Sequence, residues 1–212
     1  MASTKDNIIA QSVKLFNKHG FTNVSMKDIA DALEISPGNL TYHFKKKEDL
    51  LVSIYRELVD ERQELYGSIT VLPGIANIHA LLKPLMDLHL KYRFFYVDML
   101  EIARLFPSID KLNKEHINVQ INAIKSVLDY SVESGNMLPE QRKGQYYDLA
   151  HTCWMLFHFW LQQQLITGNK GSFHDQARFA IWNLVYPLLT TKGRHNFKKV
   201  EEEQTTYINS IL

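Results

Sequence analysis

The chain has 212 residues, of which 45% are hydrophobic and 22% charged, a composition typical of a folded globular protein and not of a disordered one. Lysine and arginine total 24 against 23 aspartates and glutamates, so the formal net charge of +1 excludes a uniformly basic nucleic-acid coat. The single cysteine, Cys153, excludes an intramolecular disulfide and an all-cysteine zinc site.

Charge and hydropathy along the chain give two further expectations. Residues 1–47 hold seven basic and four acidic side chains, which is either a chance excess or a short basic head on a neutral body. The first ten residues, MASTKDNIIA, lack the apolar run of a secretory signal peptide, and no uncharged apolar stretch of roughly 18 residues occurs in the chain. We therefore expect a cytoplasmic protein with no membrane partner.

Helical periodicity dominates from the N-terminus onwards. The first helix is expected from about Thr4 to His19. Gly20 follows it and is expected to form a C-terminal cap in the left-handed conformation. Nowhere in the sequence does a pair of alternating apolar runs flank a hairpin turn. The sequence therefore predicts an all-α protein.

Two short helices are expected after the first one. Ser25 and Ser36 are the expected N-caps of helices at about residues 26–33 and 37–44. Asp28 stands three residues after Ser25, in the capping-box position. The connection between the two helices, at Glu34-Ile35, is short and keeps them close together.

The rest of the chain is predicted to be a larger helical body. Glu48 and Asp49 suit the first turn of a long helix at about residues 48–66, and Pro73-Gly74 then breaks the chain. Further helices are expected at about 75–81, 84–106, 110–134, 142–167 and 173–190. The tail from Thr191 is either a final helix or a frayed end. We place the domain boundary inside the long helix, which gives domains at residues 1–49 and 50–212.

The two short helices, joined at Glu34-Ile35, have the spacing of a helix-turn-helix. A short second helix enters the DNA major groove only if its first turn can approach the sugar-phosphate backbone closely, and Gly38, which has no Cβ, permits that approach. The expected core of the pair is Ile29, Ala30, Leu33, Ile35, Leu40 and Phe44. The predicted DNA-binding residues, which include phosphate contacts from two lysines, are Ser25, Lys27, Ser36, Gly38, Asn39, Thr41, Tyr42, His43 and Lys47.

The same segment resembles a known family. Gly20-Phe21 is followed by the run VSMKDIA at residues 24–30 and the run LEISPGNLTYHFKKKEDL at residues 33–50. This succession resembles the TetR family of bacterial transcriptional regulators over about residues 5–51, a quarter of the chain, without a gap. One position departs from the family pattern, because the residue after Leu40 is usually tyrosine. Here it is Thr41, and Tyr42 follows it.

The resemblance implies an all-helical homodimer that needs no cofactor. Its N-terminal three-helix helix-turn-helix domain would bind a double-stranded DNA operator, and its C-terminal helical domain would bind a small-molecule effector and dimerise. Such proteins typically repress transcription by covering a palindromic operator, and they release it when the effector binds. Two recognition helices about 34–36 Å apart can read both halves of a palindrome with combined energy.

Two helices of the body, at about 84–106 and 142–167, are apolar on more than one face. Taken singly, each aromatic side chain there is most simply a core residue. Together they suit a helical shell around an apolar cavity that accepts a flat or hydrophobic ligand. The expected ligand-binding residues are Tyr92, Phe95, Met99, Phe106, Tyr147, Trp154 and His158.

The last two long helices are the expected dimer face, because in the TetR family the corresponding pair from each subunit forms a four-helix bundle. Tryptophan is enriched in interface hot spots, which favours the aromatic positions of these helices. The expected interface residues are Trp160, Gln164, Phe179, Trp182 and Tyr186. The sequence leaves open which aromatics face the partner and which face the cavity.

Of three alternatives, two are disfavoured and one stays open. A metal sensor is disfavoured because His151 and His158, two helical turns apart, are separated by about 10.5 Å along the axis, too far to share one ion. An enzyme is disfavoured because three common catalytic motifs are missing from the sequence. These are a nucleotide-binding glycine loop, the histidine-glutamate motif of metalloproteases and the Gly-x-Ser-x-Gly motif of serine hydrolases. A transcriptional activator or adaptor with the same DNA-binding head stays open.

Overall fold

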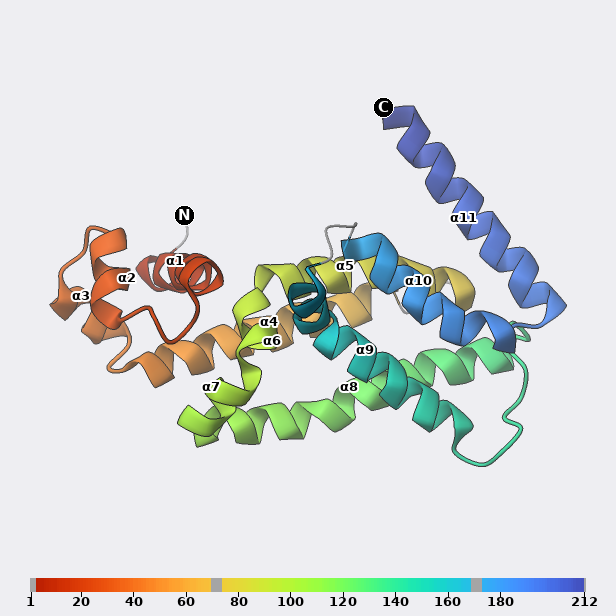
Figure 1. The fold of residues 1–212 in the computed structure, drawn as a ribbon, viewed down its shortest axis with the longest axis horizontal. Helices are drawn as coiled ribbons and strands as arrows, with labels where there is room; N and C mark the ends of the chain where they lie inside the picture. Colours follow the sequence, from red (N-terminus) through yellow and green to blue (C-terminus); the bar gives the residue numbers. More distant parts are fainter. Residues whose placement is uncertain (1–2, 70–73, 169–172, 212) are drawn as a thin grey trace. The chain divides into compact units, whose positions relative to one another are not determined.

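The computed structural model describes residues 3–69, 74–168 and 173–211, and nearly all of these are helical (Figure 1). No strand occurs among them, only one isolated antiparallel bridge between Met137 and Leu189. The all-α prediction is confirmed. In chain order the elements are α1 (Thr4–His19), α2 (Met26–Ala32), α3 (Pro37–His43), α4 (Lys47–Ile69), α5 (Gly74–Lys91), α6 (Arg93–Val97), α7 (Met99–Leu105), α8 (Pro107–Glu133), α9 (Gln145–Thr167), α10 (Phe173–Val185), the 3₁₀ turn η1 (Tyr186–Leu188) and α11 (Thr191–Ile211).

The chain forms two compact units, and each is built from two stretches of sequence. The first, here called the head unit, comprises Met1–Gln63 and Leu88–Glu115. The second, the body unit, comprises Glu64–Asp87 and His116–Leu212. These units group the chain differently from the predicted boundary between residues 49 and 50, because α6, α7 and most of α4 belong with α1–α3. That residues 1–49 form a domain by themselves stays a prediction.

The N-terminal helices begin and end close to the predicted positions. The helix at 4–19 has the expected bounds, and Ser3, which the sequence reading missed, caps it by accepting a hydrogen bond from the Asp6 amide at 3.2 Å. Gly20 has a positive φ of 82° as expected of a C-terminal cap, but its ψ of 147° is extended. The predicted left-handed conformation is therefore wrong in ψ, because the chain leaves the helix directly instead of making a further turn.

The segment predicted as two helices at 75–81 and 84–106 is divided differently. Helix α5 continues through Pro84, and the breaks occur instead at Tyr92 and Asp98. The side-chain amide of Asn17, on α1, holds the first break by donating to the Lys91 carbonyl at 2.7 Å and accepting from the Phe94 amide at 2.9 Å. A distant side chain thus takes over backbone groups that a continuous helix would pair internally.

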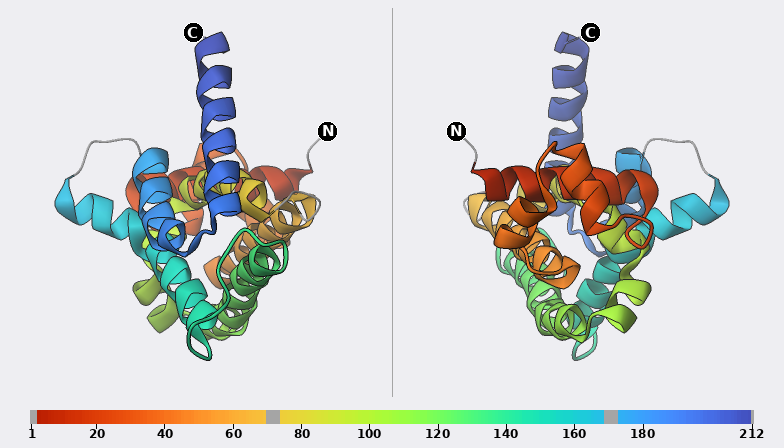
Figure 2. Two further views of the ribbon diagram at one scale, coloured as in Figure 1. Left: turned by 90° about the vertical axis from the view of Figure 1, so that its right-hand side faces the viewer. Right: turned by 90° about the vertical axis from the view of Figure 1, so that its left-hand side faces the viewer.

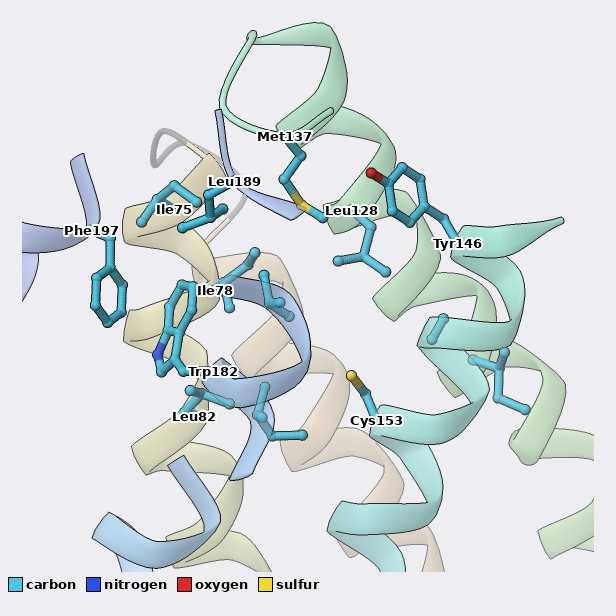
Figure 3. Packing of buried hydrophobic residues seen from close by; sticks show 14 residues of the cluster. Ile75, Ile78, Leu82, Leu128, Met137, Tyr146, Cys153, Trp182, Leu189 and Phe197 are labelled. Carbon is cyan, nitrogen blue, oxygen red and sulfur yellow. The ribbon is translucent and has the colours of Figure 1, made fainter. Parts of the chain in front are cut away.

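The body unit has its core between α5, α8, α9 and α10, with α11 covering one end (Figure 3). Ile75, Ile78 and Leu82 of α5 share this core with Trp182 of α10 and Phe197 of α11, and the Trp182 and Phe197 ring centroids are 4.6 Å apart. Cys153 is buried in the same core, and burial raises the pKa of its thiol to about 12. This agrees with an inert structural cysteine.

The tail from Thr191, undecided from sequence, is the helix α11. It begins against the turn before α9: the Thr190 amide donates to the Asn136 carbonyl at 3.0 Å. A Cβ on Gly193 would come within 2.0 Å of the same carbonyl oxygen, so only glycine fits there. Beyond Phe197, α11 extends away from α8, α9 and α10 of its own unit (Figures 1 and 2).

Candidate functional site

The segment from Ser25 to Phe44 forms the two predicted helices with the predicted caps. Ser25 Oγ accepts from the Asp28 amide at 3.2 Å, and the Asp28 carboxylate accepts from the Ser25 amide at 2.7 Å, which completes the capping box. The carboxylate also accepts from the Ser25 hydroxyl at 2.7 Å, and this bond, together with the one from the Ser25 amide, lowers the pKa of Asp28. Ser36 Oγ accepts from the Asn39 amide at 3.1 Å and so caps α3. Both helix starts are therefore fixed by residues within three positions.

The turn between α2 and α3 contains a feature that sequence analysis missed. Glu34 has a φ of 55°, and it is the only non-glycine residue with positive φ in the described part of the chain. This left-handed conformation is costly for a residue with a Cβ. It is held by hydrogen bonds on both sides, since the Glu34 amide donates to Asp31 and the Ile35 amide donates to Ala30, each at 3.1 Å.

The small core of the helix pair is largely as expected. Ile29, Ala30, Leu40 and Phe44 are buried, whereas Leu33 and Ile35 are half-buried. The apolar side chains thus lie on the inner faces of α2 and α3. This leaves the polar residues of α3 to point outwards.

The outer face of α3 carries most of the predicted DNA-binding residues. Gly38, Asn39, Thr41 and Tyr42 are exposed, and His43 is half-buried. Tyr42 is 85% exposed, and its ring meets the His43 ring edge-on with centroids 5.2 Å apart. An aromatic side chain that packs so little on its own subunit is available to a partner.

Gly38 is not required by the packing of its own chain. A Cβ built there would meet only Ser36 Oγ, at 3.8 Å, which is an ordinary van der Waals contact. The lack of a side chain therefore leaves open space at the first turn of α3. This fits the expectation that a large external molecule approaches the backbone there.

Thr41, which departs from the family pattern, uses its hydroxyl internally. Thr41 Oγ1 lies 3.0 Å from the Pro37 carbonyl oxygen and 3.1 Å from that of Gly38, and it donates its hydrogen to this pair. Its methyl group and its oxygen lone pairs remain for an external contact. Tyr42 is the residue of α3 that offers a free phenol.

Lys47 lies in a different environment from the one that sequence analysis suggested. Its Nζ donates to the Phe21 carbonyl at 2.6 Å and lies 4.0 Å from the centroid of the Phe21 ring. Burial lowers the pKa of Lys47, and the neighbouring Asp28 carboxylate partly opposes this. The lysine therefore ties the start of α4 to the loop after α1. Lys27 and Ser25, by contrast, are exposed as a phosphate contact requires.

Four of the seven predicted ligand-binding residues pack inside the head unit. Tyr92 is fully buried and donates to Glu61 at 2.6 Å, and Phe95 packs on Tyr55 with ring centroids 5.6 Å apart. Met99 accepts a weak hydrogen bond from Asn113 at 3.6 Å. Phe106 meets the Phe21 ring edge-on at 5.6 Å. Tyr92 and Phe95 are buried, whereas Met99 and Phe106 are half-buried, and each of the four has a partner within the head unit.

The other three lie on α9 in the body unit. Tyr147 is exposed, Trp154 is half-buried and His158 is buried. The Trp154 and His158 rings stack with centroids 4.6 Å apart. A cavity in this unit is lined instead by residues that sequence analysis did not select, namely Tyr66, Asn77, Leu81, Ala123, Ser126, Val127 and Tyr130. No candidate from the sequence lines it.

The predicted dimer residues divide into surface and core. Phe179 is exposed, Trp160 and Gln164 are half-buried, and the Gln164 amide donates to Gln176 at 2.9 Å. Trp182 is only 4% exposed in the single chain, because it fills the core against Phe197, and its role in a dimer interface stays a prediction. The Tyr186 ring also meets the Phe197 ring, with centroids 5.3 Å apart. Exposed apolar side chains that sequence analysis missed on α9 are Met155, Phe159, Leu165 and Ile166.

Two negative findings hold for the described residues. They contain no group of three or more histidine, cysteine, aspartate or glutamate side chains placed to hold a metal ion. Their helices include none with the length and hydropathy needed to cross a membrane.

Two family models match the chain. The model described as bacterial regulatory proteins, tetR family, matches residues 8–54. The model described as TetR, bacterial transcriptional repressor, matches residues 54–197. The first match contains α2, α3 and the turn between them, and the second contains the cavity and the exposed face of α9.

Individual relatives agree with these matches. A probable helix-turn-helix transcriptional regulator of Bacillus subtilis, YttP, is 37% identical over 76 residues, which are 36% of this chain and 34% of the relative. The chain thus matches about a third of the length of that relative. The regulator QacR of Staphylococcus aureus is 42% identical over 50 residues, 24% of this chain and 27% of QacR.

Solved structures extend the likeness to nearly the whole chain. A TetR-family transcriptional regulator from Marinobacter aquaeolei has a TM-score of 0.86 at 25% identity and covers 95% of this chain and 98% of its own. A regulator from Saccharomonospora viridis, solved in complex with choline, has a TM-score of 0.71 at 19% identity and covers 88% of this chain and 97% of its own. The second likeness concerns the fold alone.

Proposed function

The chain belongs to the TetR family of bacterial transcriptional regulators, and on this basis we propose that it represses transcription by binding a palindromic DNA operator as a homodimer and leaves the operator when a small, largely apolar ligand binds. The supporting observation is the outer face of α3. There Asn39, Thr41 and Tyr42 are exposed beside a glycine that its own chain does not require.

DNA contact would begin at the first turn of α3. The missing Cβ of Gly38 lets the backbone approach the duplex, so that Asn39 and Tyr42 reach base edges or phosphates. Ser25 and Lys27 at the start of α2 would hold a neighbouring phosphate. These contacts explain why a chain with a net charge of only +1 can still bind DNA, because the basic groups act locally.

Dimerisation would use α9 and α10. Met155, Phe159 and Ile166 on α9, together with Phe179 on α10, are large apolar side chains exposed on the single subunit. Such a surface is typical of an interface between copies. A dimer also raises DNA affinity, because the second recognition helix binds at a high effective concentration.

Ligand release would be a shift between two populations of the dimer. Moving the protein from mostly bound to mostly free requires roughly 5.5 kcal/mol of difference in ligand affinity between the two conformations. Helix α4 is one covalent link for such a shift, because it starts in the head unit at Lys47 and ends in the body unit, and α5 and α8 also pass from one unit to the other. The choline complex of the Saccharomonospora viridis regulator is an example of a small molecule held by this fold.

Gly38→Ala tests the DNA contact most sharply. The added Cβ has room in the free protein, so folding is retained, but it would meet the DNA backbone. We expect affinity for the DNA upstream of the chain's own gene to fall about tenfold in a gel shift, equivalent to about 1.4 kcal/mol. Gly67→Ala is the matched control, since a Cβ there would meet nothing within 4 Å and the residue lies on α4, not on α3. No binding by the parent protein overturns the function, and unchanged binding by Gly38→Ala overturns the contact.

Two lysine variants separate phosphate binding from internal packing. Lys27→Ala should reduce the slope of log affinity against log salt by about one, because one phosphate contact is lost. The phosphate role of Lys47 stays a prediction. A smaller salt slope in Lys47→Ala at unchanged melting temperature supports that role. A lower melting temperature at unchanged slope assigns Lys47 to its contact with Phe21 alone.

A reporter assay distinguishes repressor from activator. If the chain represses, deleting its gene raises expression from the promoter that it binds. If it activates transcription, the same deletion lowers expression. The DNA contacts would be the same in both cases.

A further inference from the structure

A cavity of about 340 Å³ lies between α4, α5 and α8 of the body unit. This volume is at the lower end of the range for small-molecule sites in proteins. Tyr66 comes from α4, and α5 contributes two residues. The remaining lining residues, Ala123, Ser126, Val127 and Tyr130, follow one another along α8 at helical spacing.

Asn77, which lines this cavity, has a buried oxygen without a partner. The residue is 7% exposed, and its Oδ1 accepts no hydrogen bond. Asn136 in the same unit shows the usual arrangement: it is 2% exposed, its Nδ2 donates to Ser134 at 2.8 Å, and its Oδ1 accepts from Asn196 at 2.8 Å. An unpaired buried carbonyl is destabilising, so we expect Asn77 Oδ1 to accept a hydrogen bond from a molecule other than the chain itself.

The other lining side chains indicate what kind of molecule the cavity accepts. None of them is an aspartate, glutamate, lysine, arginine or histidine. Leu81, Ala123 and Val127 are aliphatic, and the two tyrosines add ring surface. The Ser126 hydroxyl already donates to the Asn122 carbonyl at 3.0 Å. A ligand with a full charge would find no opposite charge here, and burying it unpaired is unfavourable.

We propose that this cavity binds an uncharged, largely apolar molecule whose hydroxyl group donates a hydrogen bond to Asn77 Oδ1. That the cavity binds such a molecule follows from its lining alone. That this molecule is the effector rests on the proposed ligand-responsive function. An occupant would contact Tyr66 of α4, the helix whose first residues adjoin α3 in sequence. The lining of the cavity thus indicates the chemical class of the ligand. None of its residues is among the seven that sequence analysis selected.

A matched pair of probes tests the hydroxyl. 4-Phenylphenol carries the donor, and 4-methoxybiphenyl has the same rings without it. By isothermal calorimetry on the full chain, we expect the phenol to bind about tenfold more tightly than the ether, which is the effect of one hydrogen bond. Decanoate and benzyltrimethylammonium serve as charged probes and should bind more weakly than the phenol. Equal binding of phenol and ether, tighter binding of a charged probe or no binding of the phenol overturns the assignment.

Asn77→Leu locates the contact. The variant should retain or exceed the parental melting temperature, because an unpaired buried amide is replaced by an apolar side chain of similar size. It should also bind the phenol and the ether equally. Asn122→Leu is the matched control: it changes an exposed amide on α8 that does not line the cavity, and it should retain the tenfold preference. A preference that persists in Asn77→Leu places the phenol elsewhere and overturns the assignment.

A gel shift with and without 4-phenylphenol separates this inference from the proposed function. If the chain binds no DNA, the proposed function fails, and the calorimetry alone still decides whether the cavity binds the phenol. If the chain binds DNA and the phenol fails to bind, the cavity assignment fails and the DNA-binding function stands. If both bind and the phenol releases the DNA, the cavity is the effector site.

Discussion

Two regions of the head unit contain helix breaks that are held in opposite ways. In the region of α2 and α3, each helix start is held by a side chain within three residues, Ser25 with Asp28 and Ser36 with Asn39. In the region of α5, α6 and α7, the breaks at Tyr92 and Asp98 have no side-chain cap of their own. They are held by Asn17 and by the Phe21 amide, which are 74 to 77 positions away in the sequence.

The backbone hydrogen bonds around Tyr92 differ from those of a continuous helix. In a continuous helix the Lys91 carbonyl would accept from the Phe95 amide, but here the Phe95 amide donates to Tyr92 at 3.0 Å. The Lys91 carbonyl and the Phe94 amide are both taken by the one amide group of Asn17. The break thus exists because α1 packs there. The break at Tyr92 therefore depends on a contact with α1, whereas the starts of α2 and α3 depend on partners within three residues.

Asn17→Ala should produce the largest effect on this comparison. It removes two hydrogen bonds and leaves two backbone groups at the Tyr92 break without their partner, which should cost about 2–3 kcal/mol of unfolding free energy in urea. Asn23→Ala is the control, because Asn23 makes one exposed local bond to the His19 carbonyl at 2.9 Å. Equal losses in the two variants would show that the distant contact is no stronger than a local one.

Ser36→Ala tests the local side. Loss of the N-cap bond to Asn39 should cost about 1 kcal/mol, and hydrogen exchange should increase in the first turn of α3. Ser53→Ala is the matched serine variant, since its hydroxyl bonds to the Asp49 carbonyl inside a helix and caps nothing. If exchange rises equally around Tyr92, the two breaks are coupled and the division into local and distant control is wrong.

Glu34→Gly should stabilise the turn between α2 and α3. Glycine adopts a φ of 55° without the steric cost that a Cβ imposes, and we expect a net gain of about 0.5 kcal/mol after its greater unfolded-state entropy is included. Thermal unfolding measures this gain. Glu34→Ala retains the Cβ and should give none, so an equal gain from alanine would attribute the effect to the lost carboxylate.

Acidification gives the smallest effect, and its action on the local caps can be followed at the capping box of α2. The pKa of Asp28 is lower in the folded chain than in the unfolded one, so the unfolded state binds protons more readily. The stability from this carboxylate is present above the unfolded pKa, about 3.9, and is lost as pH falls through the lower folded pKa. Asp28→Asn should flatten the acid limb of a stability–pH curve below about pH 4. An unchanged limb would show that the capping box contributes no pH dependence.

The same division explains what the sequence could predict. The caps at Ser25 and Ser36 and the bounds of α1 follow from residues close together in the chain, and they were found. The sequence does not predict the Tyr92 break, because its partner, Asn17, is remote in sequence. The prediction of a helix start at Pro84 is wrong, since α5 continues through this residue. A prediction from local pattern has no access to such a partner.

The site was predictable to a similar degree. The outer face of α3 follows from helical spacing, so its exposed residues were identified. The internal position of Lys47 and the burial of Trp182 depend on which neighbour fills the adjacent space, namely Phe21 and Phe197. The cavity at Asn77 was missed for the same reason, since three separate helices create it.

The burial of Cys153 has a practical consequence for labelling this protein at an introduced cysteine. A thiol whose pKa is about 12 carries almost no thiolate near neutral pH, and thiolate is the form that reacts with maleimides and methanethiosulfonates. The natural chain therefore behaves towards such reagents as if it had no cysteine. A reporter thiol placed on an exposed loop can be spin-labelled without first removing Cys153, and a distance measured between two such labels would then test the proposed dimer while DNA or ligand is added.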